Sequence, residues 1–216
     1  MEESVWRVDA DASLQAVLDD RHCPALLSQA LMDIHSWQLR NETVLSRALK
    51  SSRLFAHLTA ALLALGAVVT IEDEGGKSEV RLQDLARDSG KGKVVSLSVP
   101  QVQSMRWGES HVARTPSDEP IVAAFAVVSS KDGVVEEARI VLSGASPGPA
   151  WVADAAQGLL DHPLSDASIE EVVSALLEEV RPVGDYRGSE EYRREMAGVL
   201  TRRALEDCLH SEVGDE

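Results

Sequence analysis

The chain has 216 residues, of which 44% are apolar and 26% are charged, so it is large enough and apolar enough to fold around a core. Its formal net charge of −15 disfavours nucleic acid and anionic membrane surfaces as partners, because both repel an acidic surface. The first residues have no secretory-type apolar segment, and no apolar run is long enough to cross a bilayer. We therefore expect a cytoplasmic protein, with Cys23 and Cys208 as reduced thiols outside any metal-binding spacing.

The first part of the sequence predicts helices. Apolar residues recur at helical spacing from residue 11 to residue 35, and Pro24 is placed to begin the second of two helices. A loop is expected at about 38 to 52. A short helix should then run from Leu54 to Leu65 and end at Gly66, a residue type that often follows a helix C-terminus.

Strands are expected next. "AVVTIED" and "SEVRL" flank the tight turn "EGGK" and predict a hairpin, and "VVSLSV" predicts another strand after a Gly-rich connection at 88 to 93. The segment from Pro100 to Asp118 contains two prolines, Pro100 and Pro116, and reads as a loop. It is the expected boundary between two domains, residues 1–103 and residues 104–216.

The second half predicts a hairpin followed by helices. "PIVAAFAVVSS" and "VVEEARIVLSG" flank "KDG", where Gly133 can take a positive φ. Ser168 with Glu171 forms a capping-box pattern, and Ser189 is placed to cap the last helix. The three expected helices span about 149–161, 169–181 and 189–209.

A family resemblance is carried by the pattern D-x-R-G-S-x-E-Y-R-R-x-M, from Asp185 to Met196, with further matches in "PALLSQAL", "QLRN" and "LLALGA". The sequence, from about residue 6 to 209, resembles the FAD-binding medium subunit of molybdenum hydroxylases, the xanthine dehydrogenase and carbon monoxide dehydrogenase type. The resemblance implies an α+β fold made of the middle and C-terminal subdomains of that scaffold. The C-terminal one is expected as a three-stranded antiparallel sheet packed on a three-helix layer.

The flavin loop is where the sequence departs from that family. No Gly-rich loop of the family's A-G-G-T-D type occurs, and we take the chain to begin after the subdomain that carries it. The family's second flavin loop reads R-N-x-A-T-I-G-G-N-L; here Ser46 and Arg47 replace the two glycines, Ala48 replaces the asparagine, and His57 stands at a later aspartate. Paired glycines allow backbone N–H groups to approach phosphate, and side chains would fill that space. The expectation is that no cofactor is bound.

Polar and aromatic residues near the former flavin cleft are the candidates for chemistry. An imidazole can move a proton, a carboxylate can assist it, and arginines can hold an anionic substrate. The candidate catalytic residues are His57, His111 and Glu109, and the candidate substrate-binding residues are Trp37, Arg47, Arg53, Arg106, Trp107 and Arg114. The plainer alternative is that each histidine is an ordinary surface or core residue and that the arginines are solvated.

Three functions fit this pattern. The first is a flavin-independent biosynthetic enzyme that binds a small organic substrate and catalyses a non-redox cyclisation or isomerisation. The second is an FAD-dependent oxidoreductase subunit whose pyrophosphate-binding subdomain comes from another chain. The third is a non-catalytic assembly protein. The first is the function we expect, with a homodimer as the assembly that would cover the face left by the missing subdomain.

Overall fold

The computed structural model describes residues 4–51, 53–85, 92–101, 104–115 and 117–211. The chain divides into two compact units, Met1–Gln101 (unit 1) and Val102–Glu216 (unit 2), and each is described by itself. In the described part of the chain, no helix combines the length and the apolarity needed to span a membrane.

Unit 1 is built on a four-stranded antiparallel sheet with the order β1-β4-β2-β3. Side chains alternate between its faces because successive residues of a strand point to opposite sides. Leu97 and Val69 are fully buried on one face, whereas Arg7, Asp9 and other polar side chains lie on the opposite face. The strands are β1 (Ser4–Asp9), β2 (Val68–Asp73), β3 (Gly76–Arg81) and β4 (Lys93–Gln101).

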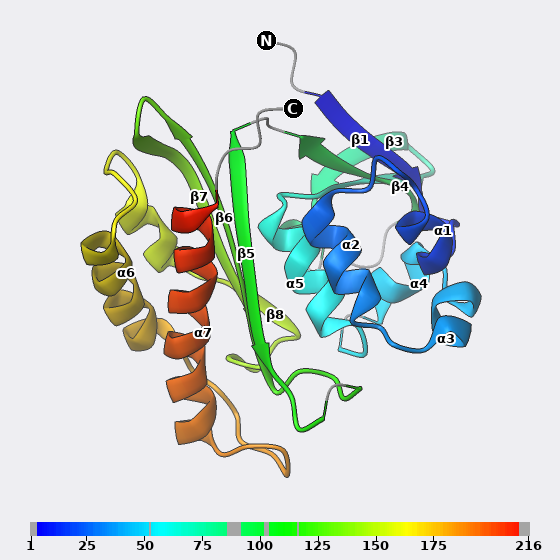
Figure 1. The fold of residues 1–216 in the computed structure, drawn as a ribbon. Helices are drawn as coiled ribbons and strands as arrows, with labels where there is room; N and C mark the ends of the chain where they lie inside the picture. The colour runs from blue at the N-terminus through cyan, green and yellow to red at the C-terminus, as the bar shows by residue number, and fades with distance from the viewer. Residues whose placement is uncertain (1–3, 52, 86–91, 102–103, 116, 212–216) are drawn as a thin grey trace. The chain divides into compact units, whose positions relative to one another are not determined.

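In the described part of unit 1, helices cover one side of this sheet and leave the other side without a helix (Figure 1). Ser13 and Ser36 begin the first and third helices, and each side-chain oxygen accepts a hydrogen bond from a backbone N–H in the first turn. Gly66, with φ of 68°, follows the C-terminus of the fifth helix as expected. The helices are α1 (Leu14–Leu18), α2 (Ala25–Met32), α3 (Trp37–Glu42), α4 (Leu45–Lys50), α5 (Ala56–Ala64) and the 3₁₀ turn η1 (Leu82–Asp84).

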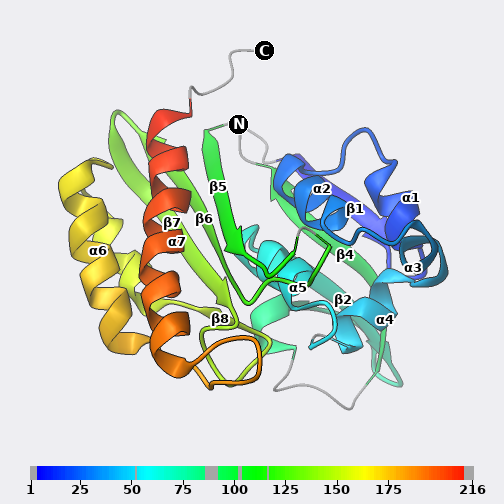
Figure 2. The same ribbon diagram turned by 60° about the horizontal axis from the view of Figure 1, so that its bottom comes forward.

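Unit 2 is a second four-stranded antiparallel sheet, in the order β5-β6-β7-β8, with its helices along one face (Figures 1 and 2). Its core consists of residues from β6 and β7 packed against two long helices, with Leu142 and Leu200 almost fully buried. The elements are β5 (Met105–Val112), β6 (Val122–Lys131), β7 (Val134–Ser143), β8 (Ala150–Val152), η2 (Asp154–Leu159), α6 (Asp166–Glu179) and α7 (Glu190–His210).

Glycine allows α7 to pack closely on this sheet. A Cβ on Gly108 in β5 would lie 2.0 Å from the carbonyl oxygen of Ala204 in α7, so any larger residue would push the helix away. Gly198 makes a similar, looser contact with Leu177 of α6. The close packing of α7 against β5 therefore depends on the single hydrogen of Gly108.

The expected fold class is confirmed, and several elements differ from their predictions. The loop expected at 38 to 52 contains two helices, α3 and α4. The loop expected from Pro100 to Asp118 contains β5. The helix expected at 149–161 is wrong: the segment forms β8 and a 3₁₀ helix, and β8 gives the sheet a fourth strand.

The predicted turn and helix caps of unit 2 agree better with the structure. The turn "KDG" is confirmed, with positive φ at both Asp132 and Gly133. Ser189 caps α7 as predicted. The capping box of α6 is formed by Ser165 with Ser168, three residues before the predicted pair. The Gly-rich connection at 88 to 93 lies mostly outside the described residues.

Candidate functional site

The segment that aligns with the flavin loop folds into two short helices in unit 1. Val44 separates α3 from α4 and forms an isolated β-bridge with Ser13. Ala48 is buried and Arg47 is exposed on α4. The Ser13–Val44 bridge therefore holds this segment against the residues between β1 and α1.

The backbone N–H groups of this segment are already used. Leu45 N donates to Ala12 O at 2.9 Å, and Ser46 N donates to Ala10 O at 2.8 Å. Arg47 N and Ala48 N both donate to the carbonyl of Val44, at 3.0 and 3.1 Å. A pyrophosphate cradle needs several unpaired N–H groups that converge on one point. The N–H groups of residues 45–48 are all bonded to carbonyl groups, so this segment does not fit the pyrophosphate-binding role of the family loop.

His57 belongs to a partly buried polar pair in unit 1. It lies near the start of α5, and its Nε2 is 2.9 Å from Oδ2 of Asp33, which follows α2. Sequence reasoning named His57 but missed Asp33, because nothing in the chain order signals that the end of α2 meets α5. A carboxylate within hydrogen-bond distance of an imidazole nitrogen fixes the orientation of the ring.

The other candidates of unit 1 are spread over its helical side. Trp37 is 67% exposed at the start of α3, and Arg53 is exposed before α5. Arg47 is exposed on α4. In the described part of unit 1, no hydrogen bond or ion pair joins these three side chains to one another, so their role in binding stays a prediction.

In unit 2, β5 carries four of the candidates and divides them between its two faces. Trp107, Glu109 and His111 are spaced two residues apart along the strand, so their side chains point to the same face. Nδ1 of His111 is 2.8 Å from Oε1 of Glu109, so the two predicted catalytic groups are paired. Arg106 points to the opposite face and donates from Nη2 to Ser130 Oγ at 2.9 Å.

Arg114 lies in the loop after β5. Its guanidinium pairs with Asp118 at 3.3 Å and sits over the ring of Tyr186, 5.5 Å from the ring centroid. Arg114 therefore takes part in a loop contact of unit 2, next to the Asp185–Met196 pattern.

That pattern itself forms a buried polar network. Arg193 on α7 is 3% exposed and donates through Nη1 to the carbonyls of Ile121 and Gly144, at 2.7 and 3.1 Å. Its Nη2 donates to Asp185 Oδ1 at 2.6 Å. Burial acts to raise the pKa of Asp185, but hydrogen bonds from Arg193 and Arg187 outweigh it and hold the pKa of this carboxyl well below its usual range. The motif thus joins the start of α7 to two loops of the sheet.

Comparison with known proteins identifies this unit. Residues 110–208 match the family described as the CO dehydrogenase flavoprotein C-terminal domain. Unit 2 is therefore similar to this flavoprotein domain over most of its length. The resemblance carried by the Asp185–Met196 pattern is confirmed, because that pattern lies inside the matched flavoprotein domain.

Two relatives and one solved structure extend the match to both units. The chain is 23% identical over 188 residues to the glyceraldehyde dehydrogenase medium chain of Sulfolobus acidocaldarius, covering 84% of this chain and 67% of the relative. It is 26% identical over 193 residues to the 6-hydroxypseudooxynicotine dehydrogenase complex subunit alpha of Paenarthrobacter nicotinovorans, covering 86% and 65%. The chain thus spans about two thirds of the length of these curated relatives.

The fold matches a chain in a structure of carbon monoxide dehydrogenase from Hydrogenophaga pseudoflava, which lacks the Mo-pyranopterin moiety of the molybdenum cofactor. The TM-score is 0.82 at 22% identity, over 97% of this chain and 76% of that chain. These relatives correct the expected function. The hypothesis of a cofactor-independent cyclase or isomerase is wrong, since the chains that resemble this one are named as dehydrogenase chains and subunits.

Proposed function

We propose that this chain is a medium-type subunit of a multi-subunit oxidoreductase of the molybdenum hydroxylase class. The observation that supports this best is the match of residues 110–208 to the flavoprotein C-terminal domain, together with a fold likeness to a chain of carbon monoxide dehydrogenase that also covers unit 1. The relatives named as a medium chain and as a complex subunit point the same way. In this proposal the chain works with partner chains, and the complex carries out the redox reaction.

A specific observation favours a structural role for the chain inside that complex. The four N–H groups from Leu45 to Ala48 are bonded within unit 1, so the segment cannot cradle a pyrophosphate without breaking these bonds. Under this second candidate function, the subunit supports assembly and contributes no pyrophosphate cradle from α4. A flavin, where bound, would be held by other groups.

A flavin titration tests the structural role. The purified chain is titrated with FAD while flavin fluorescence is recorded, beside the triple variant Ser46→Gly, Arg47→Gly, Ala48→Asn, which restores the family residues. We expect no saturable binding at micromolar FAD for either protein, because glycine does not release the N–H groups from their partners in α4 and near β1. Saturable binding by the unmodified chain would contradict the structural role, while leaving the oxidoreductase proposal in place.

A further inference from the structure

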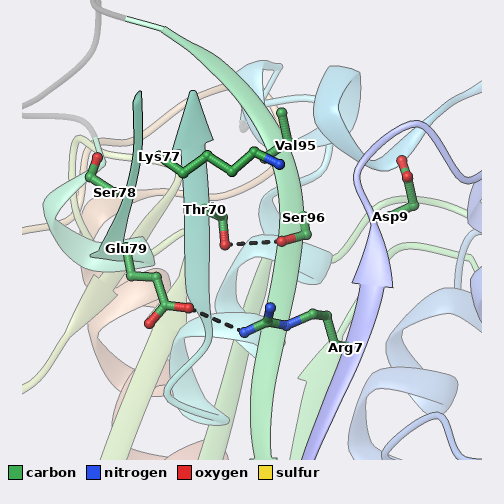
Figure 3. Close-up of a pocket in the computed structure, with 8 residues that line it drawn as sticks. All are labelled: Arg7, Asp9, Thr70, Lys77, Ser78, Glu79, Val95 and Ser96. Carbon is green, nitrogen blue, oxygen red and sulfur yellow. Dashed lines mark hydrogen bonds and ion pairs between the residues drawn. The ribbon is translucent and has the colours of Figure 1, made fainter. Parts of the chain in front are cut away.

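The polar face of the unit 1 sheet is hollowed. An open depression of about 520 Å³ lies on the face opposite the helices, and its volume is within the range of small-molecule sites. Its lining comes from all four strands: Arg7, Asp9, Thr70, Lys77, Ser78, Glu79, Val95 and Ser96 (Figure 3). None of these residues belongs to the sites discussed above.

Two hydroxyl groups form the floor of the depression. Thr70 in β2 and Ser96 in β4 are paired across the two central strands, and Ser96 Oγ donates to Thr70 Oγ1 at 2.9 Å. Thr70 is only 8% exposed, so this floor is set by the backbone register of the strands. A hydroxyl floor can both donate and accept hydrogen bonds, which suits a polar ligand.

Long cationic side chains from the two edge strands fold over this floor. Arg7 from β1 crosses the sheet to Glu79 of β3, with Nη2 3.1 Å from Oε1, and its Nε donates to Ser98. Lys77 extends from β3 toward β4, with its ammonium group near Val95 (Figure 3). Within the described residues, the Lys77 ammonium has no ion pair and Arg7 Nη1 has no hydrogen bond. Both groups can therefore bind a ligand carboxylate.

The anionic end of the depression is Asp9 in β1. Its Oδ1 accepts a hydrogen bond from Asp11 N at 2.7 Å, and in the described part of the chain its Oδ2 has no hydrogen-bond partner. Figure 3 shows Asp9 beyond the end of Lys77, on the far side of β4. A ligand that lies between them meets a positive group at one end and a negative group at the other.

We propose that this depression binds a small zwitterion, an unbranched or short amino acid whose carboxylate lies against Lys77 and Arg7 and whose ammonium lies against Asp9. The charge of the chain supports this class of ligand. A protein with net charge −15 repels a plain anion at long range, whereas a neutral zwitterion carries no such penalty. Because the depression is open to solvent, the affinity should be roughly millimolar. The proposal is independent of the oxidoreductase role.

The test is a titration of the full-length, isotope-labelled chain followed by amide chemical shifts. The probes are glycine, β-alanine, 4-aminobutyrate and 6-aminohexanoate, in which the distance between ammonium and carboxylate grows stepwise. Butyrate and butylamine carry one of the two charges each and serve as ligand controls. We expect saturable shifts in the strands β1, β2, β3 and β4 for at least one amino acid, with one preferred spacing.

Matched variants separate this site from general charge effects. Lys77→Met and Asp9→Asn should each weaken binding about tenfold, the value of one charge-assisted contact. Asn keeps an oxygen that accepts from Asp11 N, so the turn is retained. Arg81→Met, on the same strand as Lys77, and Glu74→Gln, in the exposed turn, should change binding less than twofold. All variants keep the native spectrum outside the depression.

Three results would overturn the proposal. The first is no saturable shift with any amino acid of the series. The second is an equal response to butyrate or butylamine, which would indicate a simple ion site. The third is binding that survives both Lys77→Met and Asp9→Asn.

Discussion

Arg193 Nη2 donates to Asp185 Oδ1 at 2.6 Å, and this pair fixes the start of α7 to the loop before it. The same guanidinium satisfies the carbonyls of Ile121 and Gly144, which lie far away in the sequence. One buried cation therefore holds together three segments of unit 2.

Removal of that cation should destabilise unit 2. Arg193→Met leaves two buried carbonyl groups and a carboxylate without their donor, so we expect a loss of about 3 kcal/mol in the free energy of unfolding. Urea unfolding of the full chain measures this. Arg203→Met, on an exposed position of the same helix, is the control and should cost less than about 0.5 kcal/mol. Equal losses for both variants would contradict the network.

The same pair predicts a pH dependence. The pKa of Asp185 is lowered in the folded protein, so its stabilising effect is complete above the usual aspartate pKa and is lost as the pH falls toward the folded value. The difference in unfolding free energy between the natural chain and Asp185→Asn should therefore shrink from about pH 6 to about pH 2. Glu195→Gln, at an exposed carboxylate of α7, corrects for the general effect of acid. A difference that stays constant with pH would exclude the ion pair as its source.

The contact of β5 with α7 gives a packing prediction. In Gly108→Ala, the new Cβ meets the carbonyl oxygen of Ala204 at 2.0 Å, which requires α7 to move. We expect a destabilisation of about 2 kcal/mol or more, measured by thermal or urea unfolding. Gly148→Ala is the matched control, because its Cβ would meet atoms no closer than 3.6 Å. A neutral Gly108→Ala would mean that α7 does not lie against β5 as described.

Cysteine reactivity provides a chemical check of the core. Burial raises the pKa of Cys208 to about 12, and its Sγ lies 3.6 Å from the carbonyl of Ala126. Burial also raises the pKa of Cys23, which is only partly covered. At about pH 8 iodoacetamide should leave Cys208 unmodified in the folded chain and modify it after unfolding, since the thiolate is the nucleophile. Mass spectrometry of tryptic peptides reads out both sites. Rapid modification of Cys208 in the folded chain would contradict the helix packing.

The strongest periodic segments were the ones that sequence alone could predict. β6 and β7 have long apolar runs, and the turn at Asp132 and Gly133 and the cap of α7 at Ser189 follow local rules. β5 escaped prediction because Arg106, Gly108 and Ser110 occupy the face toward the helices, so no apolar alternation marks the strand. β8 exists through its pairing with β7, a contact that a local pattern does not contain.

The candidate residues were predictable only in part. The pair of Glu109 and His111 follows from strand alternation once β5 is known, whereas the pair of His57 and Asp33 depends on how α2 packs beside α5. For the flavin loop, the sequence shows only which residue types replace the two glycines and the asparagine. The hydrogen bonds from this loop to Ala10 and Ala12 depend on the tertiary structure of unit 1, so the sequence could not predict them. They are a second reason why this segment does not fit a pyrophosphate.

The measurement that tests the oxidoreductase role most directly is native purification of the tagged chain from its own cells, followed by subunit stoichiometry and molybdenum content. We predict a complex with fixed ratios of partner chains and with molybdenum that elutes with the tag. The variant Arg193→Met, which perturbs the flavoprotein C-terminal domain, should reduce the yield of this complex. A chain that elutes alone, without molybdenum, from cells that express it at its natural level would contradict the account.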